Sequence, residues 1–584
     1  MKVVVGQGSC GIASGAKKTA AEFEKLIKEN NIDAEVKRTG CIGVCYLEPI
    51  VDIYDDNDNL TRYSRVKEEN VEKIVDSHLK NGKPLKEMEI PKEGEDFLKK
   101  QTRVVMSNCG IIDPENIDDY IAKDGYKALK KAITEMTQDD ICQEIEDSKL
   151  RGRGGGGFPA GRKWKQVKSQ KEPVKYVVCN GDEGDPGAFM DRSIMESDPH
   201  KMLEGMAIAG IGTGAEVGYI YVRAEYPMAV HRLEIAIEQA KEKGFLGKNI
   251  MGSGKNFDMR INLGAGAFVC GEGSALTASI EGNRGMPRVK PPRTVEKGLF
   301  EKPTVLNNVE TFANVPKIIL NGSKEYAKIG TETSPGTKAF ALTGNVNNTG
   351  IIEVPMGTEL KDIIYDIGGG VKDGKEFKAV QIGGPSGGCL TKRHMDLPLD
   401  FDSLTKEGAM IGSGGLVVMD EDTCMVSIAR FFMDFTYQES CGKCVPCREG
   451  THEMLEILDD IVEGRATEEA IETLYDLSDT ISSTALCGLG KTAPNPIQST
   501  LEEFRDEYMA HIVDKRCPTG TCQALALISI DPDKCKGCTK CVKACPTQAI
   551  KGDPKEVHVI NNDKCIKCKV CLESCPFDAI NMTH

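Results

Sequence analysis

Two runs with the same cysteine spacing stand near the carboxyl end, Cys535-Lys-Gly-Cys538-Thr-Lys-Cys541-Val-Lys-Ala-Cys545-Pro546 and Cys565-Ile-Lys-Cys568-Lys-Val-Cys571-Leu-Glu-Ser-Cys575-Pro576. This spacing is typical of a pair of [4Fe–4S] clusters, in which the fourth cysteine of each run binds the other cluster. A pair of zinc knuckles is the competing interpretation, which the doubled spacing disfavours. We therefore expect two crossed ligand sets: Cys535, Cys538, Cys541 and Cys575 for one cluster, and Cys565, Cys568, Cys571 and Cys545 for the second.

A third cysteine group lies upstream, in Ser440-Cys441-Gly-Lys-Cys444-Val-Pro-Cys447-Arg-Glu-Gly450. Its three thiols suit a further [4Fe–4S] cluster, and Cys487 is the nearest downstream candidate for the fourth ligand. Apolar residues at helical spacing between the two segments predict a helical domain around this cluster. Zinc is the alternative occupant on spacing alone.

Between this group and the carboxyl-terminal runs stand His511, Cys517 and Cys522. Cysteine and histidine at short spacing are typical of a structural zinc site, which needs a fourth ligand. We choose Cys424, because it begins the helical segment that His511 ends; the alternative is a set of inert buried thiols. The remaining cysteines are scattered singly and are expected in the core: Cys109, Cys142, Cys179, Cys270 and Cys389.

The first 80 residues read as β-α-β-β-α, with strands at 3–5, 35–37 and 51–54 and helices at 17–29 and 66–80. They carry Cys10, Cys41 and Cys45. This order suits a thioredoxin-like [2Fe–2S] domain, which uses a C-x4-C pair followed by C-x3-C. Val5 occupies the first position of that pair, so the cluster either takes a substitute ligand, such as the hydroxyl of Ser14, or is absent.

The composition of the chain argues against several classes of protein. The chain has 584 residues, 23 cysteines and a formal net charge of −15, and its mean hydropathy is −0.31. The acidity argues against nucleic-acid binding, which needs a basic face, and no apolar run approaches the ~20 residues of a membrane span. Without an export signal, the cysteines are not expected to form a disulfide framework, and a cytoplasmic location follows.

The middle of the chain holds three glycine-rich or acidic loops, each after a strand-like run: 151–157, 180–192 and 264–273. Glycine lets main-chain N–H groups converge on a phosphate because no Cβ blocks the approach. The pattern is neither the G-x-G-x-x-G fingerprint nor a P-loop. A flexible linker would explain one such run, but three suggest a single site at the strand ends of an α/β sheet.

The segments 152–164, 180–192, 264–275, 302–311 and 440–450 resemble the flavin- and pyridine-nucleotide-binding subunit of respiratory complex I. With the added first and last domains, the whole chain resembles the diaphorase subunit of multimeric electron-bifurcating [FeFe]-hydrogenases. The resemblance implies a multidomain α/β and α+β protein with five parts. They are a thioredoxin-like domain (1–90), a Rossmann-like FMN- and NAD(P)-binding α/β domain (91–335), a ubiquitin-like β-grasp insert of the soluble-ligand-binding type (336–423), a helical [4Fe–4S] bundle (424–515) and a bacterial 2[4Fe–4S] ferredoxin domain (516–584).

The resemblance also assigns cofactor residues. Gly152, Arg153, Gly154, Gly155 and Lys163 match the FMN-phosphate loop, and Asn307, Asn308 and Thr311 match further phosphate contacts. Asn180, Asp182 and Glu183 match the loop beside the isoalloxazine and the nucleotide, and Asp185 in the same loop is a shortened form of the family's acidic residue. Lining of the nucleotide pocket is implied for Phe158, Phe268, Gly271, Glu272 and Lys290.

Two departures from the family pattern bear on nucleotide choice. Gly273 replaces the glutamate expected to bind the adenosine ribose, and Arg293 replaces the aromatic expected to stack on adenine. Loss of an acid with gain of an arginine is the usual change from NAD to NADP, because a guanidinium pairs well with phosphate. We predict a preference for NADP(H) over NAD(H); drift at a tolerant rim is the alternative.

The expected activity is hydride exchange between the nucleotide and FMN, followed by single-electron transfer through the clusters, with no catalytic side chain. The resemblance implies as partners a [FeFe]-hydrogenase large subunit, a small thioredoxin-like [2Fe–2S] subunit and ferredoxin, linking NADP(H), ferredoxin and hydrogen. The alternatives are the nucleotide-oxidising subunit of an NAD(P)-dependent formate dehydrogenase, or of a hydrogenase–formate dehydrogenase complex, and an electron-transfer scaffold without FMN.

Overall fold

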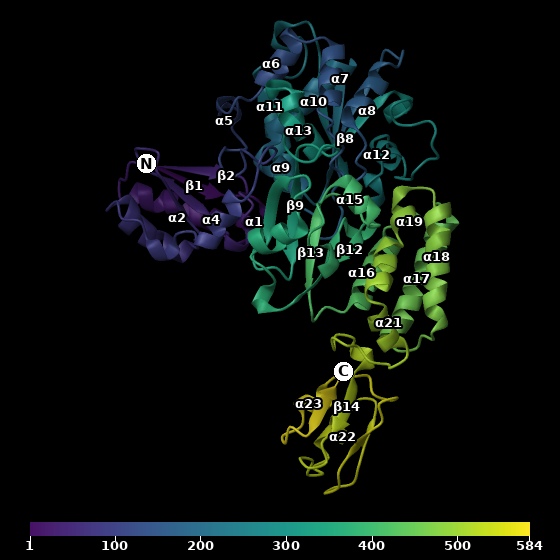
Figure 1. The fold of residues 1–584 in the computed structure, drawn as a ribbon. Helices are drawn as coiled ribbons and strands as arrows, with labels where there is room; N and C mark the ends of the chain where they lie inside the picture. Colours follow the sequence, from purple (N-terminus) through teal and green to yellow (C-terminus); the bar gives the residue numbers. More distant parts are fainter. Residues whose placement is uncertain (584) are drawn as a thin grey trace. The chain divides into compact units, whose positions relative to one another are not determined.

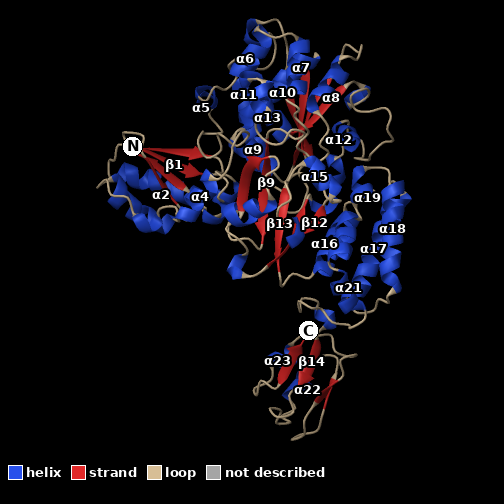
Figure 2. Cartoon of the chain, in the orientation of Figure 1, coloured by secondary structure: helices blue, strands red, loops and turns tan. Residues whose placement is uncertain are grey.

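The computed structural model describes residues 1–583, which form two compact units (Figure 1). The first unit comprises Met1–Val418 with the short segment Leu486–Gly488, and the second comprises Met419–Ala485 with the residues from Leu489 onward. Helices and strands alternate through most of the first unit, whereas the second begins with helices alone (Figure 2). Within residues 1–583, no helix is long and apolar enough to cross a membrane.

The first domain is a four-stranded sheet in the order β2-β1-β3-β4, with β1 parallel to β2 and antiparallel to β3. Apolar side chains of the sheet, such as Val3, Val5 and Ile53, pack with Phe23 and Ile74 from the helices. The expected order is confirmed except that it missed β4, a half-exposed edge strand in which polar residues hide the alternation. The elements are β1 (Lys2–Gly6), α1 (Ser9–Ala13), α2 (Ala16–Glu29), β2 (Glu35–Thr39), β3 (Val51–Tyr54), β4 (Leu60–Tyr63) and α3 (Val71–Ile74).

The second domain is built on a wholly parallel sheet in the order β7-β6-β5-β8. The chain adds β6 and β7 on one side of β5 and then crosses to the other side to add β8, so the strand order reverses between β5 and β8. In open α/β sheets, ligands bind at the carboxyl ends of the strands beside such a switch point. The strands are β5 (Tyr176–Gly181), β6 (Val217–Arg223), β7 (Asp258–Gly264) and β8 (Thr304–Asn308).

Helices pack around the central strand β5, in which the consecutive residues Val177, Val178 and Cys179 are buried. Helix α10 is buried along its whole length; most of its residues are apolar or small, and its buried Lys201 and Glu204 have polar partners. Its central glycine, Gly205, comes so close to α13 that an added Cβ would lie 2.0 Å from the carbonyl oxygen of Phe312. The main helices are α7 (Gln138–Asp147), α8 (Ala160–Lys168), α9 (Met190–Ser197), α10 (Pro199–Thr213), α11 (Pro227–Glu242), α12 (Gly273–Ile280) and α13 (Val309–Asn321).

A five-stranded mixed sheet follows, in the order β10-β9-β13-β11-β12. Strand β9 pairs antiparallel with β10 and parallel with β13. Apolar residues of its strands and of α15 share one core with residues nearer the amino terminus, such as Leu47 and Phe97. The bounds are β9 (Thr337–Gly344), β10 (Gly350–Pro355), β11 (Phe377–Ile382), β12 (Gly388–Thr391), α15 (Phe401–Lys406) and β13 (Gly415–Asp420).

The second unit opens with a bundle whose core includes Met454, Leu458, Ile481 and Tyr508. Two of its residues, Met454 and Leu458, are those whose helical spacing predicted a helix there, and α17 confirms it. The helices are α16 (Met425–Gln438), α17 (Val445–Val462), α18 (Glu469–Thr484), α19 (Gly488–Thr492), α20 (Asn495–Glu503) and α21 (Arg505–Ile512).

The carboxyl-terminal domain repeats one pattern twice, a cysteine loop followed by one short helix. Strands β14 (Leu527–Ile530) and β17 (Ile580–Thr583) pair antiparallel, as do β15 (Ile550–Lys551) and β16 (Val559–Ile560). Each short helix, α22 (Lys540–Ala544) and α23 (Val570–Glu573), begins after the second cysteine of its run. Both helices are too short to be stable alone, so buried cysteines and isoleucines hold this domain together.

Candidate flavin, nucleotide and metal sites

The glycine-rich loop lies over the carboxyl end of β8. An added Cβ at Gly154 would lie 3.0 Å from Cβ of Asn308, and one at Gly155, whose φ is +110°, would lie 3.1 Å from the main chain of Gly412. The main-chain N–H of Arg153 donates to Thr311 Oγ1 at 2.8 Å. The loop therefore occupies the switch point, where only glycine permits this approach.

The side chain of Arg153 has a structural role. It is 1% exposed, and its guanidinium donates to the carbonyl oxygens of Thr337, Arg151 and Pro335 at 2.9, 3.0 and 2.6 Å. The guanidinium donors of Arg153 are already used within the protein. Arg153 can therefore contribute to a ligand site only through the conformation of the loop's main chain.

Cationic and amide donors gather at the end of β8. Lys163 Nζ donates to the carbonyl oxygen of Leu306 at 2.6 Å, and burial together with the nearby Lys290 lowers the pKa of Lys163 to about 8. Asn307 is buried, and its Nδ2 has no hydrogen-bond partner within residues 1–583. A buried amide without a partner is costly, so this end of β8 fits a ligand with several acceptor oxygens, such as a phosphate.

The acidic loop after β5 is held by its own side chains. Asn180 Nδ2 donates to the carbonyl oxygen of Gly271 at 2.9 Å. Glu183 is buried and accepts from the main-chain N–H groups of Asp191 and Arg192 at 3.0 and 3.1 Å, at the start of α9. Burial raises the pKa of Glu183. Glu183 therefore orders the loop, rather than pointing a free carboxylate at a ligand.

Asp185 and Asn308 connect this loop to its surroundings. Ser413 Oγ donates to Asp185, and burial raises the pKa of that carboxyl group. Asn308 Oδ1 caps α13 by accepting from the N–H of Glu310 at 2.9 Å, and its Nδ2 donates to Asp191. These bonds connect the loop after β5 to Ser413 and connect the end of β8 to the start of α9 and α13.

The expected nucleotide residues meet at the start of α12. Glu272 accepts from the N–H groups of Ser274 and Ala275 at 2.8 and 3.1 Å and pairs with Lys290 Nζ at 2.6 Å. Burial alone would raise the pKa of Glu272, but the bonds from Lys290 and Ser274 hold it below its ordinary value. The Glu272 carboxylate is therefore ionised, and its oxygen atoms already have hydrogen-bond and ion-pair partners within the protein.

Neither of the two positions that depart from the family pattern, Gly273 and Arg293, adds a second carboxylate beside Glu272. An added Cβ at Gly273 would meet only apolar atoms, Leu306 Cδ1 at 3.4 Å and Thr294 Cγ2 at 3.6 Å. Arg293 is exposed, and its guanidinium makes no ion pair within residues 1–583. Phe158, the expected stacking aromatic, is 40% exposed.

Sequence reasoning missed Arg288. Its N–H donates to Ser274 Oγ at 3.1 Å, while its Nε and Nη2 are buried and have no partner in the described chain. Two buried guanidinium nitrogens without an acceptor indicate an anion that the protein alone does not supply. The signal that could have revealed it is its place two residues before Lys290 in the same segment.

The third cysteine group surrounds the start of α17. Cys447 is buried in its first turn, and an added Cβ at Gly490 would lie 3.1 Å from Cβ of Cys447. The turn that follows Cys487 therefore runs beside Cys447. Ser440 Oγ lies 3.3 Å from Cys447 Sγ.

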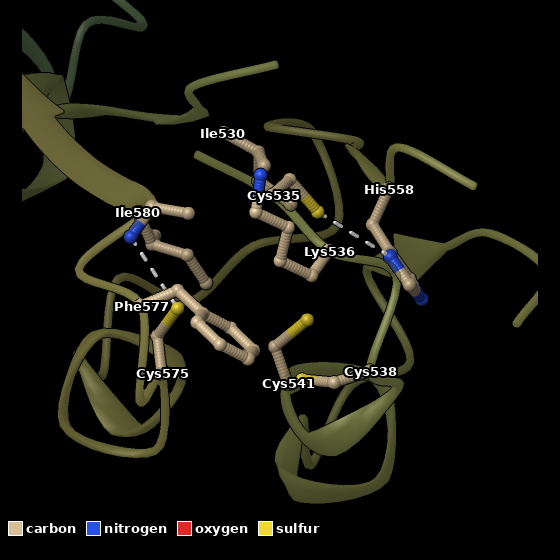
Figure 3. Close-up of a pocket in the computed structure, with 10 residues that line it drawn as sticks. Ile530, Cys535, Lys536, Cys538, Cys541, His558, Cys575, Phe577 and Ile580 are labelled. Atoms are coloured by element: carbon tan, nitrogen blue, oxygen red, sulfur yellow. Dashed lines mark hydrogen bonds between the residues drawn. The ribbon is translucent and has the colours of Figure 1, made fainter. Parts of the chain in front are cut away.

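The two carboxyl-terminal runs line two separate hollows. Figure 3 shows the first hollow, with Cys535, Cys538, Cys541 and Cys575 around it and His558 Nδ1 3.8 Å from Cys535 Sγ. The second is lined by Cys565, Cys568, Cys571 and Cys545. The fourth cysteine of each run thus lies with the other run, in the crossed grouping that the spacing predicts.

Four further ligand groups converge in the helical bundle, namely Cys424, His511, Cys517 and Cys522, with their ligand atoms within 4.8 Å of one another. His511 Nε2 lies 3.4 Å from Cys424 Sγ and 3.3 Å from Cys522 Sγ, and the two sulfurs are 3.7 Å apart. Its Nδ1 lies 2.7 Å from the carbonyl oxygen of Glu507, which leaves Nε2 for a metal. Tetrahedral zinc with bonds of about 2.0–2.3 Å needs ligand atoms at about these separations.

In the first domain, the sulfurs of Cys10, Cys41 and Cys45 also lie within 4.8 Å of one another. Ser14, the substitute ligand considered from the sequence, is exposed at the end of α1. The five single cysteines are all buried, as expected.

Models of known protein families match four stretches of the chain. Residues 145–317 match the Nuo51 FMN-binding domain, 340–390 the SLBB domain, 427–511 the NADH-ubiquinone oxidoreductase-F iron-sulfur binding region, and 528–582 a 4Fe-4S dicluster domain. These matches confirm the expected multidomain fold class.

Related proteins cover most of the chain. The HndC subunit of the NADP-reducing hydrogenase of Solidesulfovibrio fructosivorans is 55% identical over 79% of this chain and 94% of its own length. The F 2 subunit of the NADH-quinone oxidoreductase of Rhizobium meliloti is 44% identical over 71% and 99%. A solved NAD+-reducing [NiFe]-hydrogenase in the H2-reduced state is 28% identical, with a TM-score of 0.63 over 88% of this chain and 84% of the matched one.

Proposed function

The chain belongs to the family of oxidoreductase subunits that includes the F-type subunits of NADH-quinone oxidoreductase and the HndC subunit of NADP-reducing hydrogenase, and we propose that it exchanges hydride between NADP(H) and FMN and passes electrons singly through iron–sulfur clusters to a hydrogenase. The observation that carries this proposal is the group of donors at the carboxyl end of β8, where a glycine loop, a half-buried lysine and an unpaired buried amide come together.

These residues fit FMN. We assign the main-chain N–H groups of Gly154 and Gly155, Lys163 Nζ and Asn307 Nδ2 to its phosphate, because these donors lie at the carboxyl end of β8. Bound FMN supplies the conversion of a two-electron hydride transfer into single-electron steps. The loop Asp182–Asp185 would position the rings of bound FMN. Hydrogen bonds of Asn180 and Glu183 hold the loop itself in place. Stoichiometric FMN in the purified chain tests this assignment and separates it from a scaffold without flavin.

The proposed preference for NADP(H) rests on charge. Position 273 offers no carboxylate to repel a 2′-phosphate, and Arg288 and Arg293 provide two guanidinium groups without ion pairs in the described chain. Arginine is the residue best suited to bidentate phosphate contacts. Catalytic efficiencies of dye reduction with NADPH and NADH test the preference, and an NADH advantage of about tenfold would reject it.

The proposed electron route has three [4Fe–4S] clusters. The first acceptor is assigned to Cys441, Cys444, Cys447 and Cys487, and Gly490 of α19 lies against Cys447. The other two occupy the hollows of the carboxyl-terminal domain. The group Cys424, His511, Cys517 and Cys522 binds one structural zinc ion, which is redox-inactive and therefore lies outside the route.

The proposed partners are a hydrogenase large subunit of the [FeFe] type, a small thioredoxin-like [2Fe–2S] subunit and ferredoxin, in the cytoplasm, with electron bifurcation among NADP(H), ferredoxin and H2. The identity with a subunit of an NADP-reducing hydrogenase supports the hydrogenase over a formate dehydrogenase. Purification of the native complex and identification of its large subunit tests this choice. A formate dehydrogenase large subunit in that complex would reject the hydrogenase assignment without affecting the flavin site.

A further inference from the structure

Three thiols from separate segments of the first domain converge on one point. Cys10 lies in the first turn of α1, Cys41 in the loop after β2, and Cys45 at the start of the next helical turn, Cys45–Leu47. The Sγ atoms of Cys10 and Cys41 are 3.1 Å apart, and those of Cys41 and Cys45 are 3.9 Å apart. The N–H of Gly43 donates to Cys41 Sγ at 3.3 Å.

A buried carboxylate faces this group. Glu48 is 8% exposed. Its Oε2 accepts from the N–H of Ile50 at 2.9 Å, which leaves Oε1 directed at Cys10 Sγ at 3.7 Å. No Lys, Arg or His pairs with Glu48 in the described part of the chain. A buried carboxylate among thiols, with no cation beside it, either takes up a proton or binds a cation, and the three adjacent thiols supply further ligands for a cation.

The surrounding glycines make room for this arrangement. An added Cβ at Gly8 would lie 2.7 Å from Cβ of Cys41, and one at Gly11 would lie 3.1 Å from Glu48 Oε2. Side chains at these positions would push the cysteine loop or the carboxylate away. The close approach of α1, Cys41 and Glu48 therefore depends on residues without a Cβ.

These residues do not fit a [2Fe–2S] cluster. Such a cluster divides its ligands between two irons, so one of three thiolates must lie across the cluster from the other two. Here all three sulfurs lie within 4.8 Å of one another. Val5, at the position where the cluster pattern has a cysteine, is fully buried in the apolar core with Val3 and Phe23.

We propose that Cys10, Cys41, Cys45 and Glu48 bind a single zinc ion in place of a binuclear cluster. Tetrahedral Zn²⁺ takes thiolate and carboxylate ligands with bonds of about 2.0–2.3 Å, so its ligand atoms lie about 3.5–3.8 Å apart. The separations of 3.1, 3.9 and 3.7 Å bracket that range. Zinc neutralises the thiolates and the carboxylate and accepts no electron.

The site also lies where the first domain contacts the flavin-binding domain. The N–H of Cys41 donates to Ser197 Oγ at 3.1 Å, and Ser9, next to Cys10, donates from its N–H and Oγ to Glu196 at 2.9 and 2.6 Å. Both acceptors belong to α9. The ion therefore fixes the two segments that hold the first domain against α9, so its role is structural.

The test is the zinc and iron content of the full-length chain after anaerobic reconstitution, measured by inductively coupled plasma mass spectrometry. We expect two zinc ions per chain, one for each cysteine-rich group, and about twelve irons from three [4Fe–4S] clusters. One zinc with about fourteen irons would overturn the proposal, as would one zinc with twelve.

Single substitutions test whether one of the two zinc ions is bound by Cys10, Cys41, Cys45 and Glu48. Cys41→Ser should lose one zinc and no iron, and Glu48→Ala should lower zinc retention against a chelator by about tenfold or more. The exposed Ser14→Ala is the matched control and should retain both ions. Loss of about two irons in Cys41→Ser would instead establish a binuclear cluster. FMN content should stay stoichiometric in every variant, so failure here is distinguishable from failure of the flavin assignment.

Because a ligand variant can misfold, cadmium-substituted wild-type chain provides a second measurement. Its ¹¹³Cd spectrum should show two thiolate-rich resonances, and Glu48→Gln should shift only one of them. A single resonance in the wild type would reject the site.

Discussion

The ammonium group of Lys163 donates a 2.6 Å hydrogen bond to the carbonyl oxygen of Leu306, one residue before Asn307 on β8. Helix α8 and strand β8 are distant in sequence, yet this bond brings a cation from the glycine-loop segment to the strand end where the flavin phosphate is proposed to lie. With the flavin absent, burial and Lys290 lower the pKa of Lys163 to about 8.

The affinity for FMN should therefore fall above pH 8. Below that pH Lys163 is charged before FMN binds, whereas above it binding must also take up a proton, so the affinity falls by up to about tenfold per pH unit. Lys163→Met should weaken binding at pH 7 by about 10–100-fold, as expected for one bond to a charged group, and should abolish this pH dependence. FMN titration of the apoprotein by flavin fluorescence measures both effects.

The matched control is Lys165→Met. Lys165 lies on the same helix, but its Nζ donates to Gln143 on the exposed side. A pH profile that is the same in Lys163→Met and in the wild type would refute the role of Lys163.

Gly273→Glu should move the preference toward NADH. The added side chain meets only Leu306 and Thr294 in ordinary contact, so it can reach the ribose without distorting α12. A carboxylate there accepts from ribose hydroxyls and repels a 2′-phosphate. The ratio of catalytic efficiencies, NADPH over NADH, should fall by about tenfold or more. Gly273→Gln, of equal size without charge, should change it much less; equal effects of the two substitutions would show that size, not charge, governs the choice.

Cys444→Ala should stop electrons from leaving the flavin while FMN remains bound. Removing one ligand disrupts the proposed first acceptor, but no residue of the proposed flavin site is altered. Reduction of a small dye by NADPH should persist, and ferredoxin reduction should be lost. Cys142→Ser, a buried cysteine that only donates to the carbonyl oxygen of Gly212, is the control. Ferredoxin reduction that survives in Cys444→Ala would disprove the route.

Paired substitutions distinguish crossed from uncrossed ligand sets in the last domain. If Cys575 belongs with Cys535, the double variant Cys535→Ala/Cys575→Ala loses one cluster, and its iron content falls by about four. Cys565→Ala/Cys575→Ala then removes a ligand from each cluster, and about eight irons are lost. The uncrossed arrangement predicts the opposite pair of values, so iron analysis of the two variants decides between them.

The sequence determined the features whose chemistry is local. Runs such as Cys535–Cys545 place successive thiolates in one tight loop, so spacing alone indicates the cluster. The glycines between positions 152 and 157 likewise predict a close approach of the main chain to a ligand or to another segment, because a residue without a Cβ leaves room for it. The helical spacing around Met454 and Leu458 likewise predicted α17, because an amphipathic face depends only on neighbouring turns.

The tertiary structure decided what depends on segments far apart in the chain. The order β7-β6-β5-β8 places the switch point beside β8, and no strand pattern states that order. Arg288 stands out only because the fold buries two of its guanidinium nitrogens without an acceptor. In the sequence, nothing distinguishes Glu48 from a glutamate on the surface. Folding buries it beside Cys10, where water no longer solvates its charge. That loss of solvent, which cysteine spacing does not report, is the physical reason why Glu48 could be recognised as a ligand beside Cys10, Cys41 and Cys45 only in the folded chain.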